Sequence, residues 1–240
     1  MLPGKKFGSI RLYVDLPLAD GSTIAATAAQ AHYLGAVMRR GIGESVRLFN
    51  GRDGEFAARI ATMRRGTASF LVERKLRAQA SEPDLWLVFA LLKRDATDLV
   101  VQKATELGVA ALFPVITERT NANRVNEARL AAIAVEAAEQ CERLTVPMVH
   151  KPHPLKAMLG NWEPGRRLFV AAERAAAPAI GSARGPAALL VGPEGGFTPA
   201  ELEAMRARPF VTAVSLGPRI LRADTACIAG LALLQAADRG

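Results

Sequence analysis

The segment LWLVFALL (85–92) is a run of apolar residues with no polar interruption. A β-strand with one face in water alternates apolar and polar residues, so an uninterrupted run is typical of a strand covered on both faces. Further apolar segments alternate with helical patterns, which predicts strands at 109–116, 168–172, 187–191 and 211–216 and helices near 97–107, 127–144, 199–207 and 225–237. This alternation predicts an α/β fold, with a parallel sheet and helices on both faces.

The residues before this run show a different pattern. Short, partly alternating segments separated by turn signals such as Asn50-Gly51 and Asp53-Gly54 predict strands at 10–14, 45–49, 55–61 and 68–74. Several short strands at this spacing favour a small β-barrel. The polar stretch RAQASEPD that follows is typical of a linker. The expected organisation is therefore a barrel domain at 1–76, a linker at 77–84 and an α/β domain at 85–240.

Positive charge is concentrated near the start of the chain. The formal charge is +8; residues 1–80 contain 13 Lys or Arg against 6 Asp or Glu, while residues 81–240 contain 18 against 17. A general preference for arginine would spread over the whole length, so the asymmetry favours a first domain that binds nucleic acid. The candidate RNA contacts are Arg11, Arg39, Arg40, Arg52 and Lys93, with Arg119, Arg124 and Arg143 as weaker candidates.

Some classes of protein are disfavoured by what the sequence lacks. The first residues contain no apolar signal segment, and the apolar runs are far shorter than the ~18 residues of a membrane-spanning helix. The two cysteines, Cys141 and Cys227, lie among helix-forming residues, which indicates buried thiols rather than a disulfide framework or a zinc site. We therefore expect a cytoplasmic protein with no membrane segment and no bound metal.

Two loops follow expected strands at their carboxyl ends, where open α/β sheets bind ligands. They are VGPEGGF (191–197), which leads into an expected helix, and LGPRILRADT (216–225), which leads into the last one. A glycine-rich turn between a strand and a helix first suggests a phosphate cradle. The chain lacks both the Gly-Lys-Ser/Thr sequence of a P-loop and the GxGxxG fingerprint of a dinucleotide fold.

The residues of the first loop argue against phosphate. Pro193 has no N–H to donate, and the carboxylate of Glu194 would repel a phosphate. Thr198 and Glu201 form a capping box that would occupy the free N–H groups of the following helix. Such a loop suits a neutral or positively charged ligand, and S-adenosylmethionine, with its adenosine and sulfonium, fits this description. An ordinary tight turn without a ligand is the alternative.

Both loops also carry a resemblance to a known family. GPEGGFTPAELEAM (192–205) and VSLGPRILRADTACIAGLALLQ (214–235) closely resemble the RsmE family, which methylates N3 of a uridine in 16S ribosomal RNA of the small subunit. The resemblance extends to ALLKRDATDLVVQKATELGVAALFPVITERT (90–120), EARLAAIAVEAAEQCERLTVP (127–147) and, more loosely, AHYLGAVMRRGIGESVRLFNGRDGEF (31–56). It implies S-adenosylmethionine as cofactor, a PUA-like RNA-binding barrel, a SPOUT domain with a trefoil knot, and a homodimer packed through the knotted domain.

The resemblance also implies a cofactor site built from the two loops and the end of one strand. Small residues would let the backbone approach the adenosine, and three apolar side chains would pack on the base. The implied residues are Ala172, Glu173, Val191, Gly192, Pro193, Glu194, Gly195, Gly196, Leu216, Gly217, Ile220 and Leu221.

Methylation at uridine N3 requires the loss of a proton, after which negative charge spreads onto O2 and O4. A cation near a carbonyl oxygen and an acceptor for the proton are therefore needed. Arg222 is the candidate cation, and Asp224 is the candidate proton acceptor. The family usually has Glu where this chain has Asp224, so a direct role as base requires a closer backbone. A phosphate-contacting Arg222 and a helix-capping Asp224 are the alternatives.

Three other functions stay open at this point. A SPOUT enzyme could act on another RNA atom, such as a ribose 2′-hydroxyl. An RNA-binding protein could keep the fold without catalysis. A nucleotide-binding oxidoreductase is disfavoured by the missing dinucleotide fingerprint and by Glu194.

Overall fold

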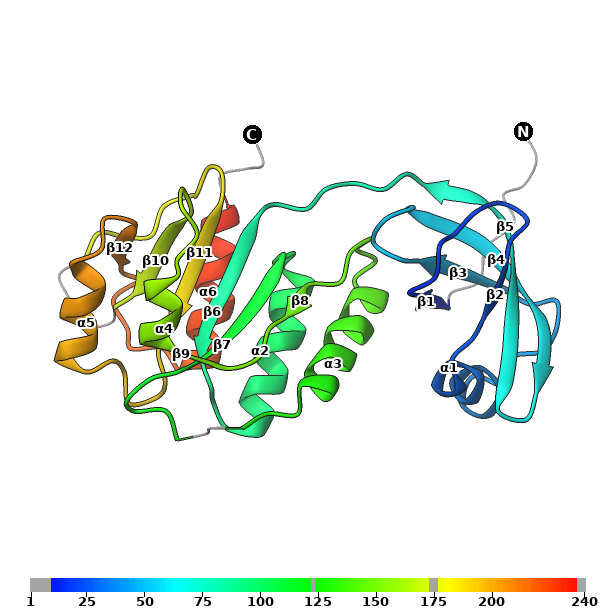
Figure 1. Ribbon diagram of the computed structural model, residues 1–240, viewed down its shortest axis with the longest axis horizontal. Coiled ribbons are helices and arrows are strands. Elements are labelled where there is room, and N and C mark those ends of the chain that lie inside the picture. Colours follow the sequence, from blue (N-terminus) through cyan, green and yellow to red (C-terminus); the bar gives the residue numbers. More distant parts are fainter. Residues whose placement is uncertain (1–9, 122–123, 173–176, 237–240) are drawn as a thin grey trace. The chain divides into compact units, whose positions relative to one another are not determined.

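The computed structural model describes residues 10–121, 124–172 and 177–236. The chain divides into two compact units, coloured along the sequence in Figure 1. The first unit contains the residues up to Ser81 together with Ala138–Thr145, and the second contains Glu82–Ala137 and the residues from Val146 onward. The return of residues 138–145 to the first unit has no counterpart in the organisation expected from the sequence.

The first unit is built on a five-stranded sheet in the order β1-β3-β4-β5-β2. The β1 and β3 strands are parallel, and the other neighbours are antiparallel. The elements are β1 (Arg11–Tyr13), β2 (Thr23–Ala25), α1 (Ala28–His32), the π-helical η1 (Tyr33–Val37), β3 (Ser45–Phe49), β4 (Glu55–Arg64) and β5 (Thr67–Arg77). The four strands expected here are present, whereas β2 and α1 are too short to give a periodic signal.

Alternation along these strands explains the core of the first unit. Val46 and Leu48 of β3 are fully buried. Phe70 of β5 is also fully buried, and Val72 of β5 is 1% exposed. Residues two apart point to the same face of a strand, so these side chains form one apolar layer. Helix α1 begins at Thr27, which forms a capping box with Gln30.

The second unit contains a seven-stranded parallel sheet. The order is β12-β10-β11-β6-β7-β8, and β9 also pairs with β7. The elements are β6 (Leu85–Ala90), α2 (Arg94–Glu106), β7 (Ala111–Ile116), α3 (Glu127–Gln140), β8 (Met148–Val149), β9 (His153–Pro154), α4 (Leu155–Gly160), β10 (Arg167–Ala171), β11 (Ala187–Val191), α5 (Pro199–Arg206), β12 (Val211–Val214) and α6 (Ala223–Gln235). The α/β fold predicted from the alternating pattern is confirmed.

Two apolar layers cover this sheet, one on each face. Leu87 and Phe89 of β6 pack in the layer formed with α2, α3 and α6. Val88, between them, packs in the opposite layer with α4 and α5 (Figure 1). Strands buried on both faces need apolar residues at every position, which explains the uninterrupted run in the sequence.

Helix α3 ends earlier than its sequence pattern suggests. The pattern predicts a helix to residue 144, but the helix ends at Gln140 and Glu142 has a positive φ of 62°. The buried guanidinium of Arg11 donates hydrogen bonds to the carbonyl oxygens of Ala138 and Arg143. The Ala138 carbonyl is one that a helix to residue 144 would have bonded internally, and here Arg11 bonds it instead. The expected end at 144 is therefore wrong.

The connection from β10 to β11 passes alongside the residues that follow β12. Ile180 donates its N–H to the carbonyl of Ser215 at 3.0 Å, and Ser215 donates to the carbonyl of Pro178 at 2.8 Å. Farther along, Ala183 donates to the carbonyl of Leu234 near the end of α6. The segment between β12 and the end of α6 is therefore bordered by this connection.

Candidate active site

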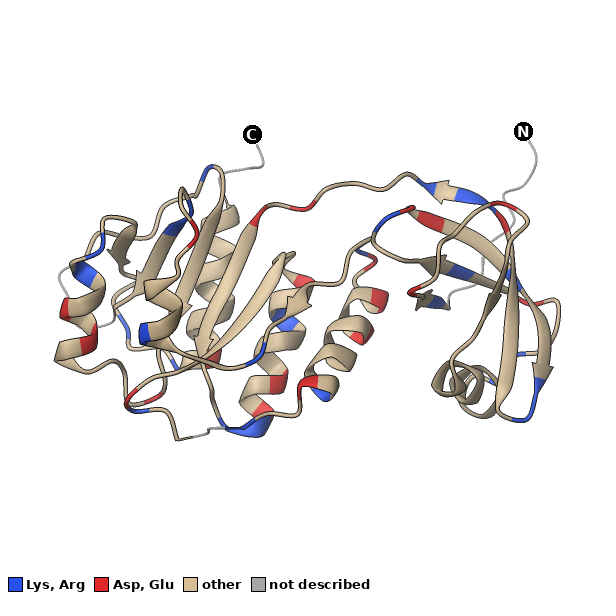
Figure 2. Cartoon of the chain, in the orientation of Figure 1, with Lys and Arg blue, Asp and Glu red and all other residues tan. Residues whose placement is uncertain are grey.

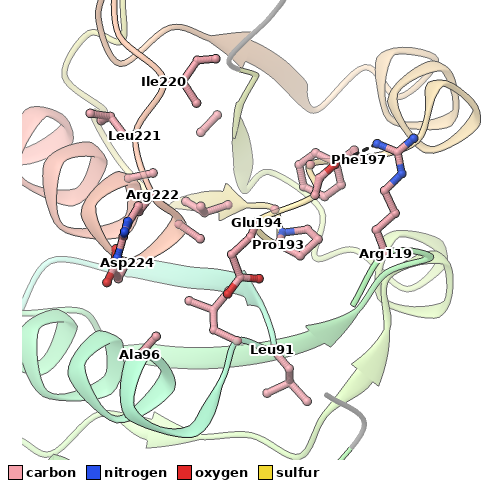
Figure 3. Close-up of a pocket in the computed structure, with 18 of the residues that line it drawn as sticks. Leu91, Ala96, Arg119, Pro193, Glu194, Phe197, Ile220, Leu221, Arg222 and Asp224 are labelled. Atoms are coloured by element: carbon pink, nitrogen blue, oxygen red, sulfur yellow. Dashed lines mark hydrogen bonds between the residues drawn. The ribbon is translucent and has the colours of Figure 1, made fainter. Parts of the chain in front are cut away.

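A large cavity lies at the carboxyl ends of β6, β10 and β11 in the second unit. Its volume is about 1100 Å³, and it is drawn in Figure 3. The β11–α5 loop (192–198) and the β12–α6 loop (215–222) both contribute to its wall, so the two loops singled out in the sequence meet at one cavity. The lining residues are Leu91, Leu92, Lys93, Ala96, Arg119, Asn121, Ala171, Ala172, Val191, Gly192, Pro193, Glu194, Gly195, Gly196, Phe197, Leu202, Arg206, Ile220, Leu221, Arg222, Ala223, Asp224 and Ala226.

Most residues of the expected cofactor site line this cavity. They are Ala172, Val191, Gly192, Pro193, Glu194, Gly195, Gly196, Ile220 and Leu221. Leu216 and Gly217 line a smaller pocket that shares Ala171, Ala172 and Leu221 with the large one. Glu173 lies outside the described residues. The side chain of Ile220 is 68% exposed, so an apolar surface at the cavity is available to a ligand.

The β11–α5 loop folds as its sequence predicts. Gly196 donates its N–H to the carbonyl of Pro193 at 2.8 Å and has a positive φ of 67°, which favours glycine. Glu201 donates its N–H to Thr198 Oγ1, and Thr198 donates its N–H to Glu201 Oε2. The predicted capping box is confirmed, so these N–H groups of α5 are not free to bind a phosphate.

The start of the connection after β7 is tied to the β11–α5 loop by two hydrogen bonds. Arg119 Nη1 donates to the carbonyl of Gly195 at 2.8 Å, and Glu118 donates its N–H to Glu201 Oε1 at 2.9 Å. From the sequence, Arg119 is only a weaker candidate for RNA contact, and the bond between Glu118 and Glu201 is not predicted. The available signal was the position of Arg119 directly after a strand whose carboxyl end faces the ligand edge.

The candidate catalytic residues lie at the start of α6. Arg222 is the N-cap residue, its side chain makes no capping hydrogen bond, and it lines the cavity. Asp224 is in the first helical turn, where Oδ1 accepts hydrogen bonds from the N–H and Oγ1 of Thr225. The alternative that Asp224 is the N-cap is therefore wrong. A carboxylate in this first turn interacts favourably with the helix dipole.

Charged side chains occupy separate parts of the cavity. In Figure 3, Arg222, Asp224 and Glu194 lie on the side nearer Ala96, while Arg119 lies on the opposite side near Phe197. The first group contains both signs of charge. A methyl donor with a positive sulfur and an acceptor base that becomes negative would both find opposite charge on that side.

The cysteine next to the cavity is unsuited to act as a nucleophile. Cys227 follows Ala226 of the cavity wall, but burial, with a smaller contribution from Asp224, raises the pKa of its thiol, so the thiol stays protonated. Within the described ranges, His, Cys, Asp and Glu residues form no group of three or more that could hold a metal ion. No helix in the described part of the chain is long and apolar enough to cross a membrane.

The expected RNA contacts of the first unit have different environments. Lys and Arg residues recur along this unit in Figure 2. Arg39 is exposed, Arg40 pairs with Glu44 at 3.0 Å, and Arg52 is exposed beside Asp15. Lys93, in the second unit, is exposed and lines the cavity.

Arg11 does not fit the expected role of an RNA contact. Its side chain is only 2% exposed, and its guanidinium pairs with Glu55 and bonds two backbone carbonyls. Arg143 is also buried, and it donates to Thr145 Oγ1. A buried guanidinium with its N–H groups occupied cannot reach a phosphate, so the prediction for these two residues is wrong.

The chain matches known families and proteins over most of its length. The family model described as an RNA methyltransferase domain matches residues 80–235, and the RNA methyltransferase PUA domain matches residues 26–73. Ribosomal RNA small subunit methyltransferase E of Rickettsia conorii is 34% identical, over 92% of this chain and 93% of the relative. The protein of the same name from Bacillus subtilis is 30% identical over 93% and 95%.

Two similar solved structures are also methyltransferases. A methyltransferase from Legionella pneumophila, solved with bound S-adenosylmethionine, superposes with a TM-score of 0.86 at 30% identity, over 95% of this chain and 97% of the other. The ribosomal RNA small subunit methyltransferase E of Neisseria gonorrhoeae, bound to S-adenosylmethionine, has a TM-score of 0.81 at 29% identity with the same coverage. The resemblance found in the sequence is confirmed: this chain belongs to the RsmE family of RNA methyltransferases, with an RNA methyltransferase PUA domain and an RNA methyltransferase domain.

Proposed function

We propose that this protein transfers a methyl group from S-adenosylmethionine to N3 of a uridine in 16S ribosomal RNA of the small subunit. The observation that carries the proposal is the single cavity to which the β11–α5 loop and the β12–α6 loop both contribute, with Arg222 in its wall. The relatives' names, small subunit ribosomal RNA methyltransferase E, support the same substrate.

The residues of the cavity fit S-adenosylmethionine. The capping box leaves the start of α5 unsuited to a phosphate, and this cofactor has none. The exposed apolar side chain of Ile220 and the backbone of Gly192–Gly196 suit the adenosine, while Glu194 supplies a carboxylate that would attract a sulfonium. When bound, S-adenosylmethionine supplies an electrophilic methyl group on a positively charged sulfur.

The residues at the start of α6 would act on the uridine. Arg222 would stabilise the negative charge that develops on a uridine carbonyl oxygen as N3 loses its proton. Asp224 Oδ2, which is not engaged by Thr225, would accept that proton or hold the base in place. Glu194 and Arg222 from separate loops would fix the relative positions of donor and acceptor, and alignment of this kind contributes much of the rate of a transfer reaction.

Four further features belong to the proposal. Arg39, Arg40 and Arg52 would contact RNA phosphates from the PUA domain. A trefoil knot in the second unit is supported by the β10–β11 connection, which borders Ser215 and the end of α6. A homodimer packed through this unit is the assembly that the family resemblance implies. A cytoplasmic location follows from the ribosomal substrate.

Nucleoside mass spectrometry of ribosomal RNA, with and without the gene, tests the proposal. We expect 3-methyluridine to disappear from 16S RNA when the gene is absent and to return after incubation with the purified protein and S-adenosylmethionine. A ribose-methylated product would instead indicate a different RNA atom. Absence of any methylated product, together with no calorimetric binding of S-adenosylmethionine at millimolar concentration, would indicate a noncatalytic RNA-binding protein.

A further inference from the structure

We propose that Arg119 and Arg206 form a subsite for a phosphate group of the RNA strand that carries the target base. This inference rests on the proposed function, because it assigns part of the same cavity to the RNA backbone. Both arginines line the cavity, one from the start of the connection after β7 and the other from the last turn of α5. Neither position is part of the cofactor site expected from the sequence.

The charges in the cavity wall are unevenly distributed. Among the residues that the structure describes, the wall contains four cationic residues, Lys93, Arg119, Arg206 and Arg222, and two carboxylates, Glu194 and Asp224. Both carboxylates lie on the side with Arg222, away from Arg119 (Figure 3). Among the described wall residues, the side with Arg119 therefore has positive charge without a carboxylate. The nearby carboxylate of Glu201 is outside the wall and accepts the N–H groups of Glu118 and Thr198. Such a surface suits an anionic ligand.

Arg119 is held in position before any ligand binds. Its Nη1 donates to the carbonyl of Gly195, and an added Cβ at Gly195 would lie 3.5 Å from Cβ and Cδ of Arg119. The backbone of the neighbouring Glu118 is bonded to Glu201. Among the described residues, Nε and Nη2 of Arg119 have no hydrogen-bond partner, so the guanidinium keeps donors for an oxyanion.

Arg206 is a free cation at the same cavity. It is exposed and four residues after Leu202, which also lines the cavity, so the two side chains share one face of α5. Within the ranges that the structure describes, no ion pair or hydrogen bond of the Arg206 side chain is found. A planar guanidinium with unused donors is well suited to bind a phosphate in a bidentate manner.

The size of the cavity leaves room for this second ligand. Ligand pockets usually have volumes of ~300–1,000 Å³, and this one is about 1100 Å³. A methyl transfer needs the donor and the acceptor nucleotide in the site together. The cofactor loops and Arg222 would hold the donor and the base, so Arg119 on the opposite side and Arg206 of α5 would remain for the sugar-phosphate backbone of the acceptor.

The variants Arg206→Gln and Arg208→Gln form a matched pair for the test. Each removes one positive charge, but Arg208 is exposed and does not line the cavity. The substrate is 16S RNA from cells that lack the gene. For Arg206→Gln we expect kcat/KM for RNA to fall about tenfold. The slope of log kcat/KM against log salt concentration should decrease in magnitude by about one. The calorimetric Kd for S-adenosylmethionine should stay within about twofold of the wild type. Arg208→Gln should match the wild type, and Arg206→Lys should recover part of the loss.

Two outcomes would overturn the subsite. If Arg206→Gln weakened S-adenosylmethionine binding as much as it weakened RNA methylation, the anion would be the carboxylate of the cofactor. If Arg206→Gln and Arg208→Gln had equal effects on RNA, the cavity position of Arg206 would have no role. Failure of the proposed function would be separate from both, because the wild type itself would then not bind the cofactor or methylate the RNA.

Discussion

The carboxylate of Glu201 accepts the backbone N–H of Glu118 at 2.9 Å, which joins two segments 83 residues apart in the sequence. The other oxygen of Glu201 accepts the N–H of Thr198, so one side chain caps α5 and also holds the connection after β7. Both segments carry residues of the cavity wall. Glu201 therefore fixes the shape of the cavity without lining it.

The variant Glu201→Gln should weaken cofactor binding. A carboxamide has one acceptor oxygen, so it can keep only one of the two N–H hydrogen bonds, and the two segments would then move relative to each other. We expect the calorimetric Kd for S-adenosylmethionine to rise about three- to tenfold, which corresponds to about 0.6–1.4 kcal/mol, the net contribution of a typical hydrogen bond. Thr198→Ala is the control, because it removes the cap but keeps the bond to Glu118. Equal effects of both variants would mean that Glu201 acts only as a helix cap.

The variant Arg222→Ala should separate catalysis from cofactor binding. Removal of one charged donor from a site that stabilises an oxyanion lowers kcat by about 10²–10³. Arg222 makes no capping bond in α6, so the helix itself should be unaffected. We expect the Kd for S-adenosylmethionine to stay within about twofold of the wild type, with single-turnover methylation as the readout. A comparable loss in cofactor affinity would contradict the role given to Arg222.

The variant Arg11→Ala should destabilise the first unit. It removes one partner of Glu55, which is 2% exposed but still pairs with Arg77 and Arg47, and it frees the carbonyls of Ala138 and Arg143. Buried acceptors left without a donor cost about 1–3 kcal/mol each, so we expect a loss of about 2–4 kcal/mol. The exposed pair of Arg52 and Asp15 is the control, and Arg52→Ala should cost less than about 1 kcal/mol. Urea unfolding measures both, and similar values would show that the burial of Arg11 is energetically unimportant.

The stability of the second unit should depend on the protonation of His150. Its ring stacks on Phe113 with centroids 3.9 Å apart, and burial, followed by the nearby charge of His153, lowers the pKa of His150. The unfolded chain then binds this proton more readily than the folded chain, so His150 supports the fold above its unfolded pKa of ~6.5. That stability is lost as the pH falls through the folded pKa.

The variant His150→Phe tests this dependence, because it keeps an aromatic ring against Phe113 and removes the titrating group. The free energy of unfolding, measured from about pH 5 to pH 7.5, should fall less steeply toward acid in the variant than in the wild type. Parallel curves would assign the acid sensitivity in this range to other groups.

Features that depend on neighbouring residues were predictable from the sequence. The apolar run at 85–92 defined a strand buried on both faces, and the capping box of Thr198 and Glu201 defined the start of α5. The loop at 192–197 is a predicted ligand loop because it follows a strand at its carboxyl end, and its composition argues against phosphate. These signals are local, since hydrophobic periodicity and helix capping involve residues within a few positions of each other.

Features that depend on distant residues were decided only by the tertiary structure. Arg11 looks like any arginine of a basic domain, and only its contacts with Ala138 and Arg143, more than 120 residues away, make it a buried structural residue. Arg119 and Arg206 line the same cavity because β7 and α5 pack near the edge of the sheet where ligands bind. The sequence thus determined the fold class, the ligand loops and the family, while the structure decided which arginines are buried and which face the cavity. The physical reason is that the charge of an arginine is known from the sequence, whereas the position of its side chain depends on how distant segments pack against one another.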